Sequence, residues 1–487
     1  MTLWLPFLSG ILLSLTLPQV GLWPLVWIAL VPYVLFLSDN RVTAWKNILG
    51  SLLFGVPYGI ATVYPLMQIT GWWWTPSSMP QAVSPELLFA GGVALVSLFG
   101  ALFFVPFGLA VRKWGRGSLS PLILAVLWVT MEWIRSFALS GFSWGVLGYA
   151  LVDTEFLKHI AAVFNVYGLS FLVVGVNAAF ALCLVLRGGL PMNFKNTSEQ
   201  LLRVVREEPK RMHGVFFVVL FFVGALAFGF ARERVLSCDG TPRTVAAIGS
   251  TLTTEESVGE GAYRHYRTKI LAALKERPDV VVLPENTFPF FELDEKDWSL
   301  RPYALVPLHN KEELYGDLLG ITRDYPETVF AVGLHTINGT KRYNSTVFYQ
   351  NGEVVARYHK RKLVPFTEFV PPPFSLPLFV TLEAGEARQL FEVKGIRVTG
   401  LSCSEIGNSR VDISGAQLIV ASSNDSVVVG TAISRVHETM ARMRALEAGA
   451  YLLRASKGEE TSIIAPNGDI IVRGEGVLVA TMEQCGT

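Results

Sequence analysis

Charged residues are scarce in this sequence. Asp, Glu, Lys and Arg make up only 17% of its 487 residues, whereas they make up about a quarter of an ordinary soluble domain. The 41 basic and 40 acidic residues give a net charge of +1, which excludes a globally basic nucleic-acid-binding protein. Hydrophobic residues make up 51% of the chain, and the mean hydropathy is +0.41. This composition is typical of a membrane protein.

Cysteine is also scarce, with four residues in the whole chain, at Cys183, Cys238, Cys403 and Cys485. Their spacing matches no zinc or disulfide motif, so we expect no bound metal. Cys183 lies inside an apolar run, where a thiol usually serves packing. Cys238 and Cys485 lie in polar surroundings, and a disulfide between them is an alternative to two free thiols.

Long apolar runs fill the first half of the chain, and each is of the kind that crosses about 30 Å of hydrocarbon. We expect seven membrane spans, near residues 3–17, 20–37, 48–69, 87–111, 119–139, 167–186 and 214–231. The first run is short and is followed by Pro18, so a cleaved signal peptide is the alternative. The missing basic segment before it and the six apolar runs after it favour a span.

The basic residues of the connections indicate an orientation. The connections after the second, fourth and sixth runs are basic, those after the first and third contain no Lys or Arg, and the long one after the fifth contains only Lys158. Basic loops stay in the cytoplasm, so the amino terminus is expected there and everything after Ala231 on the opposite side. We predict a helical membrane domain over residues 1–238 and an extracytoplasmic domain over residues 239–487.

Aromatic segments lie on the neutral side of the predicted membrane. Trp72, Trp73 and Trp74 form a run that fits either an interfacial belt or a floor for a lipid substrate. Trp144 and Tyr149 belong to a second aromatic segment. We expect this segment to contribute to the same lipid-substrate site.

Two charged residues lie inside the predicted fifth span. Glu132 and Arg135 are three residues apart and therefore share one helix face. Charged groups at membrane depth usually pair or face a wet cavity. We expect a structural ion pair, and a catalytic role is the alternative.

From about Thr241 the sequence alternates between apolar β-branched runs and amphipathic helical segments. Strands are expected at residues 244–248, 280–283, 329–334, 345–349, 354–358, 396–402, 418–422, 451–455, 462–465 and 470–472, and helices at 263–276, 314–323 and 433–447. This order predicts layered sheets with helices outside them.

Three of these strands end at reactive groups, namely Glu285, Lys360 and Cys403. Sheet enzymes often hold reactive side chains at the carboxyl ends of strands. A thiolate is the nucleophilic form of cysteine and is favoured by a nearby base or cation. We therefore interpret Glu285 as general base and Lys360 as the cation for thiolate and oxyanion. On the residues alone, a packing cysteine, a surface glutamate and a solvated lysine remain alternatives.

Six segments resemble the signatures of bacterial apolipoprotein N-acyltransferases, which are membrane members of the nitrilase (carbon–nitrogen hydrolase) superfamily. They are YHKRKLVPFTEFVP at 358–371, LPEN at 283–286, CSE at 403–405, HETMARMRALE at 437–447, WIR at 133–135 and GFSW at 141–144. The resemblance covers nearly the whole chain. It implies a multi-pass α-helical membrane bundle followed by an α/β nitrilase-like domain, an α-β-β-α sandwich.

The resemblance also implies the roles of the site residues. It assigns catalysis to Glu285, Lys360 and Cys403, with Glu368 supporting the lysine and the acyl intermediate, and Glu405 needed for the site's geometry. This chemistry requires neither a cofactor nor a metal. We interpret His437 as structural, and a Cys–His dyad with Cys403 is the alternative.

The implied reaction is a ping-pong acyl transfer. Cys403 takes an acyl chain from a membrane phospholipid, with phosphatidylethanolamine expected, and passes it to the α-amine of a diacylglyceryl-cysteine at the start of an apolipoprotein. The expected location is the bacterial inner membrane, with the catalytic domain on the periplasmic side, and the expected state is a monomer without nucleic-acid partners. The alternatives are a membrane-tethered amidase or nitrilase-type hydrolase, and a non-catalytic homologue that binds lipoproteins.

Some positions depart from the family pattern. Ser404 stands where the family has tyrosine, Val427 and Val428 stand where it has an aromatic pair, and residues 249–251 lack its Gln-Gly-Asn pattern. The family usually adds an eighth span, whereas this sequence ends at Thr487. These departures concern substrate shape and acceptor rather than the three reactive groups.

Overall fold

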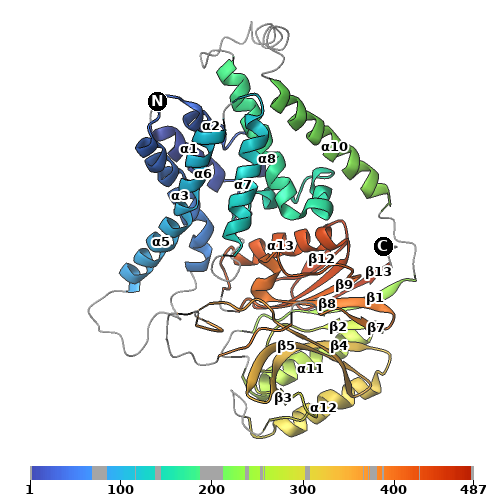
Figure 1. The fold of residues 1–487 in the computed structure, drawn as a ribbon. Coiled ribbons are helices and arrows are strands. Elements are labelled where there is room, and N and C mark those ends of the chain that lie inside the picture. The colour runs from blue at the N-terminus through green and yellow to red at the C-terminus, as the bar shows by residue number, and fades with distance from the viewer. Residues whose placement is uncertain are drawn as a thin grey trace. The chain divides into compact units, whose positions relative to one another are not determined.

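The computed structural model describes residues 3–67, 85–115, 117–137, 144–186, 212–235, 241–252, 256, 258–301, 308–365, 367–370, 372, 381–386, 389–426 and 428–483. They fall into two compact units, a helical one that reaches Arg232 and a mixed one that continues from Glu233 (Figure 1). This division lies a few residues before the boundary predicted at residue 238.

The helical unit contains a helix in each of the seven predicted runs. These are α1 (Trp4–Ser14), α2 (Val31–Ser38), α3 (Ala44–Met67), α5 (Pro85–Leu102), α6 (Phe104–Trp114), α7 (Ser120–Arg135), α8 (Ala161–Leu186) and α10 (His213–Val235), with the 3-10 helices η1 (Trp23–Trp27), η3 (Leu147–Leu151) and η4 (Leu157–Ile160). Among the described residues, four segments are long and apolar enough to cross a membrane, namely Ala44–Pro65, Gly91–Trp114, Leu157–Leu186 and His213–Val235.

The second predicted run, residues 20–37, is divided into two helices. It consists of η1 and then α2, and each begins with a proline at its first or second position, Pro24 and Pro32. Proline lacks the N–H of an inner helical turn and clashes with the preceding turn. A run that looks uniform by hydropathy is therefore split by its backbone chemistry, and the number of membrane crossings stays a prediction.

The core of the helical unit is a cluster of aromatic rings from α2, α3, α6 and α7. Tyr33 stacks on Phe54 with ring centroids 4.3 Å apart, and Phe54 meets Phe104 edge to face at 4.9 Å. Phe107 meets Trp128 edge to face at 5.3 Å. Offset and edge-to-face contacts of this kind add to the free energy gained from burial, so the cluster joins these helices firmly.

Glu132 and Arg135 are both buried at the end of α7. Glu132 Oε1 accepts hydrogen bonds from Trp128 Nε1 and Leu147 N, both at 2.9 Å, and Arg135 Nη2 donates to the Gly145 carbonyl at 2.9 Å. In the part of the chain that the structure describes, the two charged groups bind the turn before η3. Arg135 also interacts electrostatically with Glu132, and the structural ion pair between them stays a prediction.

The mixed unit contains two stacked sheets. The first has the order β13-β1-β2-β4-β5-β6, with β3 paired to β4, and the second has the order β12-β11-β10-β9-β8-β7. The strands of the first sheet are β1 (Arg243–Ile248), β2 (Val280–Val282), β3 (Glu292–Asp294), β4 (Val329–Asn338), β5 (Lys341–Gln350), β6 (Glu353–His359) and β13 (Val477–Met482). Those of the second are β7 (Phe391–Val393), β8 (Ile396–Ser402), β9 (Leu418–Asn424), β10 (Tyr451–Lys457), β11 (Thr461–Ile464) and β12 (Ile470–Gly474).

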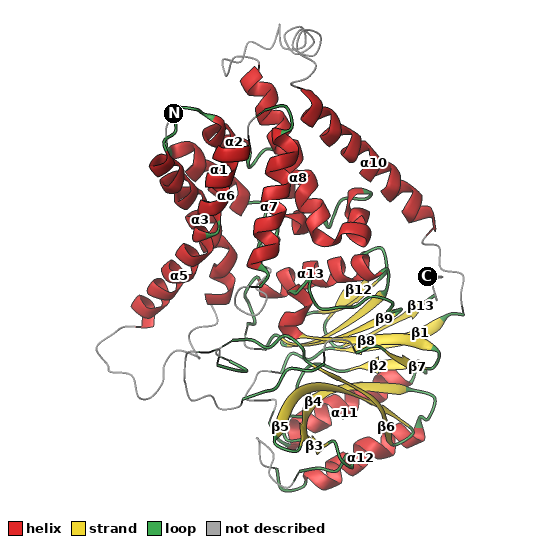
Figure 2. Cartoon of the chain, in the orientation of Figure 1, coloured by secondary structure: helices red, strands yellow, loops and turns green. Residues whose placement is uncertain are grey.

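Helices cover the outer faces of the two sheets. Helices α11 (Glu260–Leu274) and α12 (Lys311–Asp324) pack on the first sheet, and α13 (Ile433–Ala448) packs on β10 and β11 of the second. Figure 2 shows the resulting order of helix, sheet, sheet and helix within this unit. The α-β-β-α sandwich is therefore confirmed.

Side-chain alternation along the central strands builds the two parts of this core. In β1, Val245 and Ala247 belong to the core between the sheets, whereas Ala246 and Ile248 belong to the core under α11 and α12. Successive side chains of a strand point to opposite faces, and a strand covered on both faces reads as a continuous apolar run. This is why these strands were recognisable from the sequence.

Candidate active site

The candidate reactive residues lie where strands of both sheets end. Lys360 directly follows β6, Glu285 follows β2 after two further residues, and Cys403 directly follows β8. The strands β2 and β6 belong to the first sheet and β8 to the second. The site is therefore formed by both layers of the sandwich.

Glu285 is a buried carboxylate, with 7% of its surface exposed. Its Oε1 accepts hydrogen bonds from Asn344 Nδ2 at 2.6 Å and from Ser402 Oγ at 3.1 Å, and lies 3.6 Å from Lys360 Nζ. Glycine at position 333 permits this placement, because a Cβ there would lie 2.2 Å from the Pro284 carbonyl oxygen. The carboxylate thus faces donors from both sheets.

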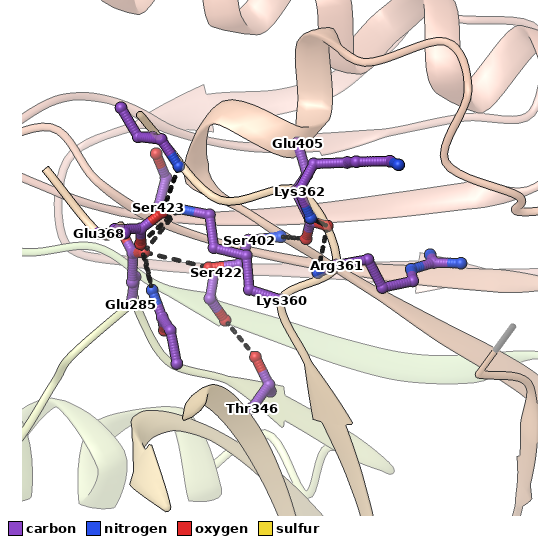
Figure 3. A network of polar contacts seen from close by, with 12 residues as sticks. Glu285, Thr346, Lys360, Arg361, Lys362, Glu368, Ser402, Glu405, Ser422 and Ser423 are labelled. Carbon is purple, nitrogen blue, oxygen red and sulfur yellow. Dashed lines mark hydrogen bonds and ion pairs between the residues drawn. The ribbon is translucent and has the colours of Figure 1, made fainter. Parts of the chain in front are cut away.

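Lys360 is a buried cation, with 1% of its surface exposed. Its Nζ donates to Glu368 Oε1 at 2.9 Å (Figure 3). Burial alone would lower the pKa of Lys360, but the carboxylates of Glu368 and Glu285 outweigh it, and the pKa is raised. The lysine therefore stays an ammonium at neutral pH and suits a cationic role rather than that of a base.

Glu368 connects the lysine to its own loop. Besides Lys360, its Oε1 accepts a hydrogen bond from Asn344 Nδ2 at 3.3 Å, and its Oε2 accepts one from Val364 N at 2.7 Å. Asn344 of β5 therefore bridges the carboxylates of Glu285 and Glu368. Sequence reasoning missed Asn344; the available signal was a polar side chain just before an apolar strand run.

Glu405 is fully buried and binds two segments together. Its Oε2 accepts hydrogen bonds from Tyr358 Oη at 2.7 Å and Ser402 N at 2.9 Å. Its Oε1 accepts from Arg361 N at 2.7 Å and Lys362 N at 2.9 Å. This one carboxylate joins the lysine segment to the turn that carries the cysteine, and its part in the reaction stays a prediction.

Cys403 begins a short 3-10 helix, Cys403–Gly407, and adopts a φ of +48°. A left-handed conformation costs a non-glycine residue about 1–2 kcal/mol, and such strain is typical of functional sites. Ser402 and Glu405 form a reciprocal capping box around it. This turn places the cysteine directly beside Ser402, whose hydroxyl contacts Glu285.

The electrostatics of the thiol link the candidate residues. Burial raises the pKa of Cys403 well above its usual value, the Glu285 carboxylate raises it further, and Lys360 lowers it. The resting side chain is therefore a thiol, and it needs a base during attack. The structure brings Glu285, Lys360 and Cys403 into one electrostatic neighbourhood, while their catalytic roles stay predictions.

Asp425 is the centre of a second buried network. Its Oδ1 contacts His437 Nδ1 at 3.1 Å, and its Oδ2 accepts hydrogen bonds from Arg454 Nη2 at 2.5 Å and Ser456 Oγ at 2.9 Å. Burial would raise the pKa of Asp425, but Arg454 and His437 outweigh it and lower the pKa. The contact of His437 with Asp425 fits the structural role expected for this histidine.

Of the five predicted lipid-binding residues, Trp72, Trp73 and Trp74 lie outside the described residues. Trp144 and Tyr149 are buried within the helical unit, and their contact with lipid stays a prediction. Cys238 and Cys485, the open disulfide pair, also lie outside the described residues, as does Val427. In the described ranges no group of three or more His, Cys, Asp or Glu side chains is arranged to hold a metal ion.

A cavity of about 430 Å³ lies beside the lysine segment. Its lining contains three basic residues and one acidic residue together with apolar side chains, namely Arg361, Lys362, Arg410, Glu383, Leu363 and Phe369. The Arg361 and Lys362 side chains point away from Glu285 and Glu368 (Figure 3). The lining is therefore both basic and apolar, as an amphipathic anion would require.

Replacing Glu405 by glutamine is expected to destabilise the mixed unit. The amide keeps the shape but offers acceptors to fewer of the four donors, and an unsatisfied buried group costs about 1–3 kcal/mol. We expect a lower midpoint of thermal unfolding and a lower reaction rate. Glu392→Gln, at an exposed carboxylate of β7, is the matched control. An unchanged midpoint and rate for Glu405→Gln would show that these four hydrogen bonds do not hold the site.

Each half of the chain matches a known protein family. Residues 9–179 match the apolipoprotein N-acyltransferase N-terminal domain, and residues 244–484 match the carbon–nitrogen hydrolase domain. Relatives named apolipoprotein N-acyltransferase include one from Geobacter metallireducens, 28% identical over 95% of this chain and 85% of its own length. Another, from Allorhizobium ampelinum, is 26% identical over 97% of this chain and 88% of its own.

Among solved structures, the mixed unit is similar to members of the nitrilase superfamily. An amidase from Nesterenkonia is 16% identical, with a TM-score of 0.37, and the similarity covers 50% of this chain and 90% of the amidase. Nit3 from Saccharomyces cerevisiae gives the same identity, TM-score and coverage of both chains.

Proposed function

The chain belongs to the apolipoprotein N-acyltransferase family, and we propose that it transfers an acyl chain from a membrane phospholipid to the N-terminal amine of a diacylglyceryl-modified apolipoprotein. The observation that carries the proposal is the cluster of the buried Glu285 and Lys360 with the partly buried Glu368, near Cys403. A membrane protein suits this reaction, because both substrates are lipid-anchored and leave a bilayer only at high cost.

In the first half-reaction, Cys403 Sγ attacks the ester carbonyl of the phospholipid. Glu285 takes the thiol proton, and the Lys360 ammonium stabilises the oxyanion of the tetrahedral intermediate. The intermediate collapses to a thioester, and protonated Glu285 gives its proton to the alkoxide of the departing lysophospholipid. The raised pKa of Cys403 supports this order, since a resting thiol must lose its proton to a base during attack.

In the second half-reaction, the α-amine of the acceptor attacks the thioester. Glu285 takes a proton from this amine, Lys360 again stabilises the oxyanion, and the Cys403 thiolate leaves. Protonated Glu285 then returns its proton to the sulfur. The amide product and the resting enzyme are formed, and the proton count closes without a cofactor.

The donor and the location are parts of the same proposal. A phospholipid such as phosphatidylethanolamine is the donor, and the cavity lined by Arg361, Lys362 and Leu363 supports an amphipathic substrate near the site. The alternation of basic and neutral connections supports a cytoplasmic membrane with the catalytic unit on the outer side. The enzyme acts there as a monomer.

The test uses the full chain with phospholipid micelles and a synthetic diacylglyceryl-cysteine peptide. We expect the mass of the peptide to rise by one acyl chain, together with release of lysophospholipid. Release of free fatty acid with an unmodified peptide would instead indicate a hydrolase that uses the same site with water. A chain that binds the peptide and releases neither product would be a non-catalytic homologue, and the proposal would be wrong.

A further inference from the structure

A second lysine is buried close to the proposed base. Lys457 is the last residue of β10, and 1% of its surface is exposed. Its Nζ donates to the Asn286 carbonyl oxygen at 2.7 Å. Asn286 directly follows Glu285, so the ammonium is held next to the turn that carries the base. The acyl-transfer steps above make no use of it.

The backbone of Lys457 is held by contacts with both sheets. Lys457 pairs with Asn424 of β9, and its carbonyl accepts a hydrogen bond from Asp425 N at 2.8 Å. It also forms a parallel bridge with Ser250, beyond the end of β1 in the other sheet. The main chain of Lys457 is therefore held at a junction between the two sheets.

The turn that Lys457 binds is itself an unusual one. Asn286 adopts a left-handed φ of +49°, which non-glycine residues adopt only where their surroundings hold them. Thr287 N donates to the Gly333 carbonyl at 2.8 Å, and Thr287 Oγ1 donates to the Pro284 carbonyl at 2.6 Å. Lys457 adds a contact from the second sheet, so both layers fix the position of Glu285.

A buried ammonium is costly unless a negative charge accompanies it. Burial lowers the pKa of Lys457 to about 8, and the Glu285 carboxylate is the charge that acts against this lowering. The other ammonium group near this carboxylate is Lys360, whose Nζ lies 3.6 Å from Glu285 Oε1. Glu285 is therefore influenced by two ammonium groups.

The other charged and titratable groups around Lys457 are engaged elsewhere. Asp425, which follows β9, is bound to Arg454 and His437. His265 of α11 contacts Ser250 Oγ through Nε2 at 3.2 Å, and Lys269 of the same helix donates to the Gly249 carbonyl at 2.6 Å. Glu285 is therefore the carboxylate with which the Lys457 ammonium interacts electrostatically.

We propose that Lys457 is a positioning residue for Glu285, which pins the turn after β2 and supplies the second positive charge that keeps this carboxylate ionised between proton transfers. The inference rests on the proposed function, in which Glu285 is the base. An ionised Glu285 is required at the start of both half-reactions, so loss of the Lys457 charge acts on thioester formation and on aminolysis alike.

The test is the pH dependence of kcat/KM for acyl transfer by the full chain in phospholipid micelles. In Lys457→Met the positive charge near the turn that carries the base is gone, and we expect the acid limb to move to higher pH by about one unit. At the low-pH end of the acid limb, kcat/KM of the variant is then about tenfold below that of the wild type. Well above pH 8 the wild-type lysine is itself mostly neutral, so the two profiles are expected to converge there. Lys457→Arg keeps the charge and is expected to restore the wild-type acid limb.

Several outcomes would overturn this role. An acid limb of Lys457→Met that coincides with that of the wild type would do so, and so would a rate lowered equally at every pH, which indicates a structural role only. Lys457→Gln is the second neutral variant if Lys457→Met does not fold, as judged by thermal unfolding. If Glu285→Gln is fully active, the proposed function itself fails. If Glu285→Gln is inactive while the Lys457 variants keep the wild-type profile, only this inference fails.

Discussion

Acyl transfer is expected to disappear when Cys403 is replaced by alanine. Without the sulfur no thioester forms, and the remaining groups have no nucleophile to activate. Removing the nucleophile of such a site lowers the rate by roughly 10⁴-fold or more. The measurement is the mass of the lipopeptide product after a fixed time with phospholipid. The fold is expected to survive, because alanine fits the same turn and the hydrogen bonds of Glu405 are made by neighbouring residues.

Cys183→Ala is the matched control for this variant. Cys183 lies in α8 of the helical unit and has no part in the proposed chemistry, so its replacement should leave transfer unchanged. Full transfer by Cys403→Ala would show that the reaction does not pass through a thioester on Cys403. If Cys183→Ala lost transfer while Cys403→Ala kept it, the reactive thiol would lie in the helical unit, which contradicts the proposal.

The second large effect is expected for Glu285→Gln. The amide oxygen takes the place of Oε1 and still accepts the hydrogen bonds of Asn344 and Ser402, but the side chain no longer accepts a proton. General base catalysis contributes about 10²- to 10⁴-fold, so kcat/KM is expected to fall by that factor. The raised pKa of Cys403 makes the loss severe, because few molecules hold a thiolate without a base.

Single-turnover measurements separate the two half-reactions of this variant. Both thioester formation and aminolysis are expected to slow, since Glu285 serves each. The exposed Glu392→Gln is the control and should react like the wild type. A Glu285→Gln enzyme with wild-type rates in both steps would assign the proton transfer to another group.

The reactive strand ends were predictable because two independent signals coincide there. The segment of β8 is a buried apolar run with the same limits as predicted, Ile396–Ser402, and it leads straight to a thiol. The end of β2 shows the same combination at Glu285, whereas β6 is exposed along much of its length and becomes buried only at its last two residues, directly before Lys360. A covered strand must be apolar on both faces, so the polar residue that stops it stands out in the sequence.

Other parts of the site could not be predicted, because their meaning depends on contacts between distant segments. Asn344 reads as an ordinary polar residue, yet it bridges two carboxylates. The strand predicted to end at Ala455 continues to Lys457, since pairing with β9 overrides the weak strand preference of serine and lysine. Likewise, no strand was predicted at the segment that forms β13. This strand pairs antiparallel with β1 and forms an edge of the first sheet.

The most direct test of the account is to look for an acyl group on Cys403. The enzyme is incubated with phospholipid without acceptor, denatured in acid and digested, and the peptide containing Cys403 is weighed by mass spectrometry. We expect its mass to increase by one acyl chain, the adduct to be released by hydroxylamine, and the adduct to vanish when the acceptor peptide is added before denaturation. An enzyme that transfers the acyl chain while Cys403 stays unmodified under these conditions, or carries the acyl group on another residue, would contradict the account.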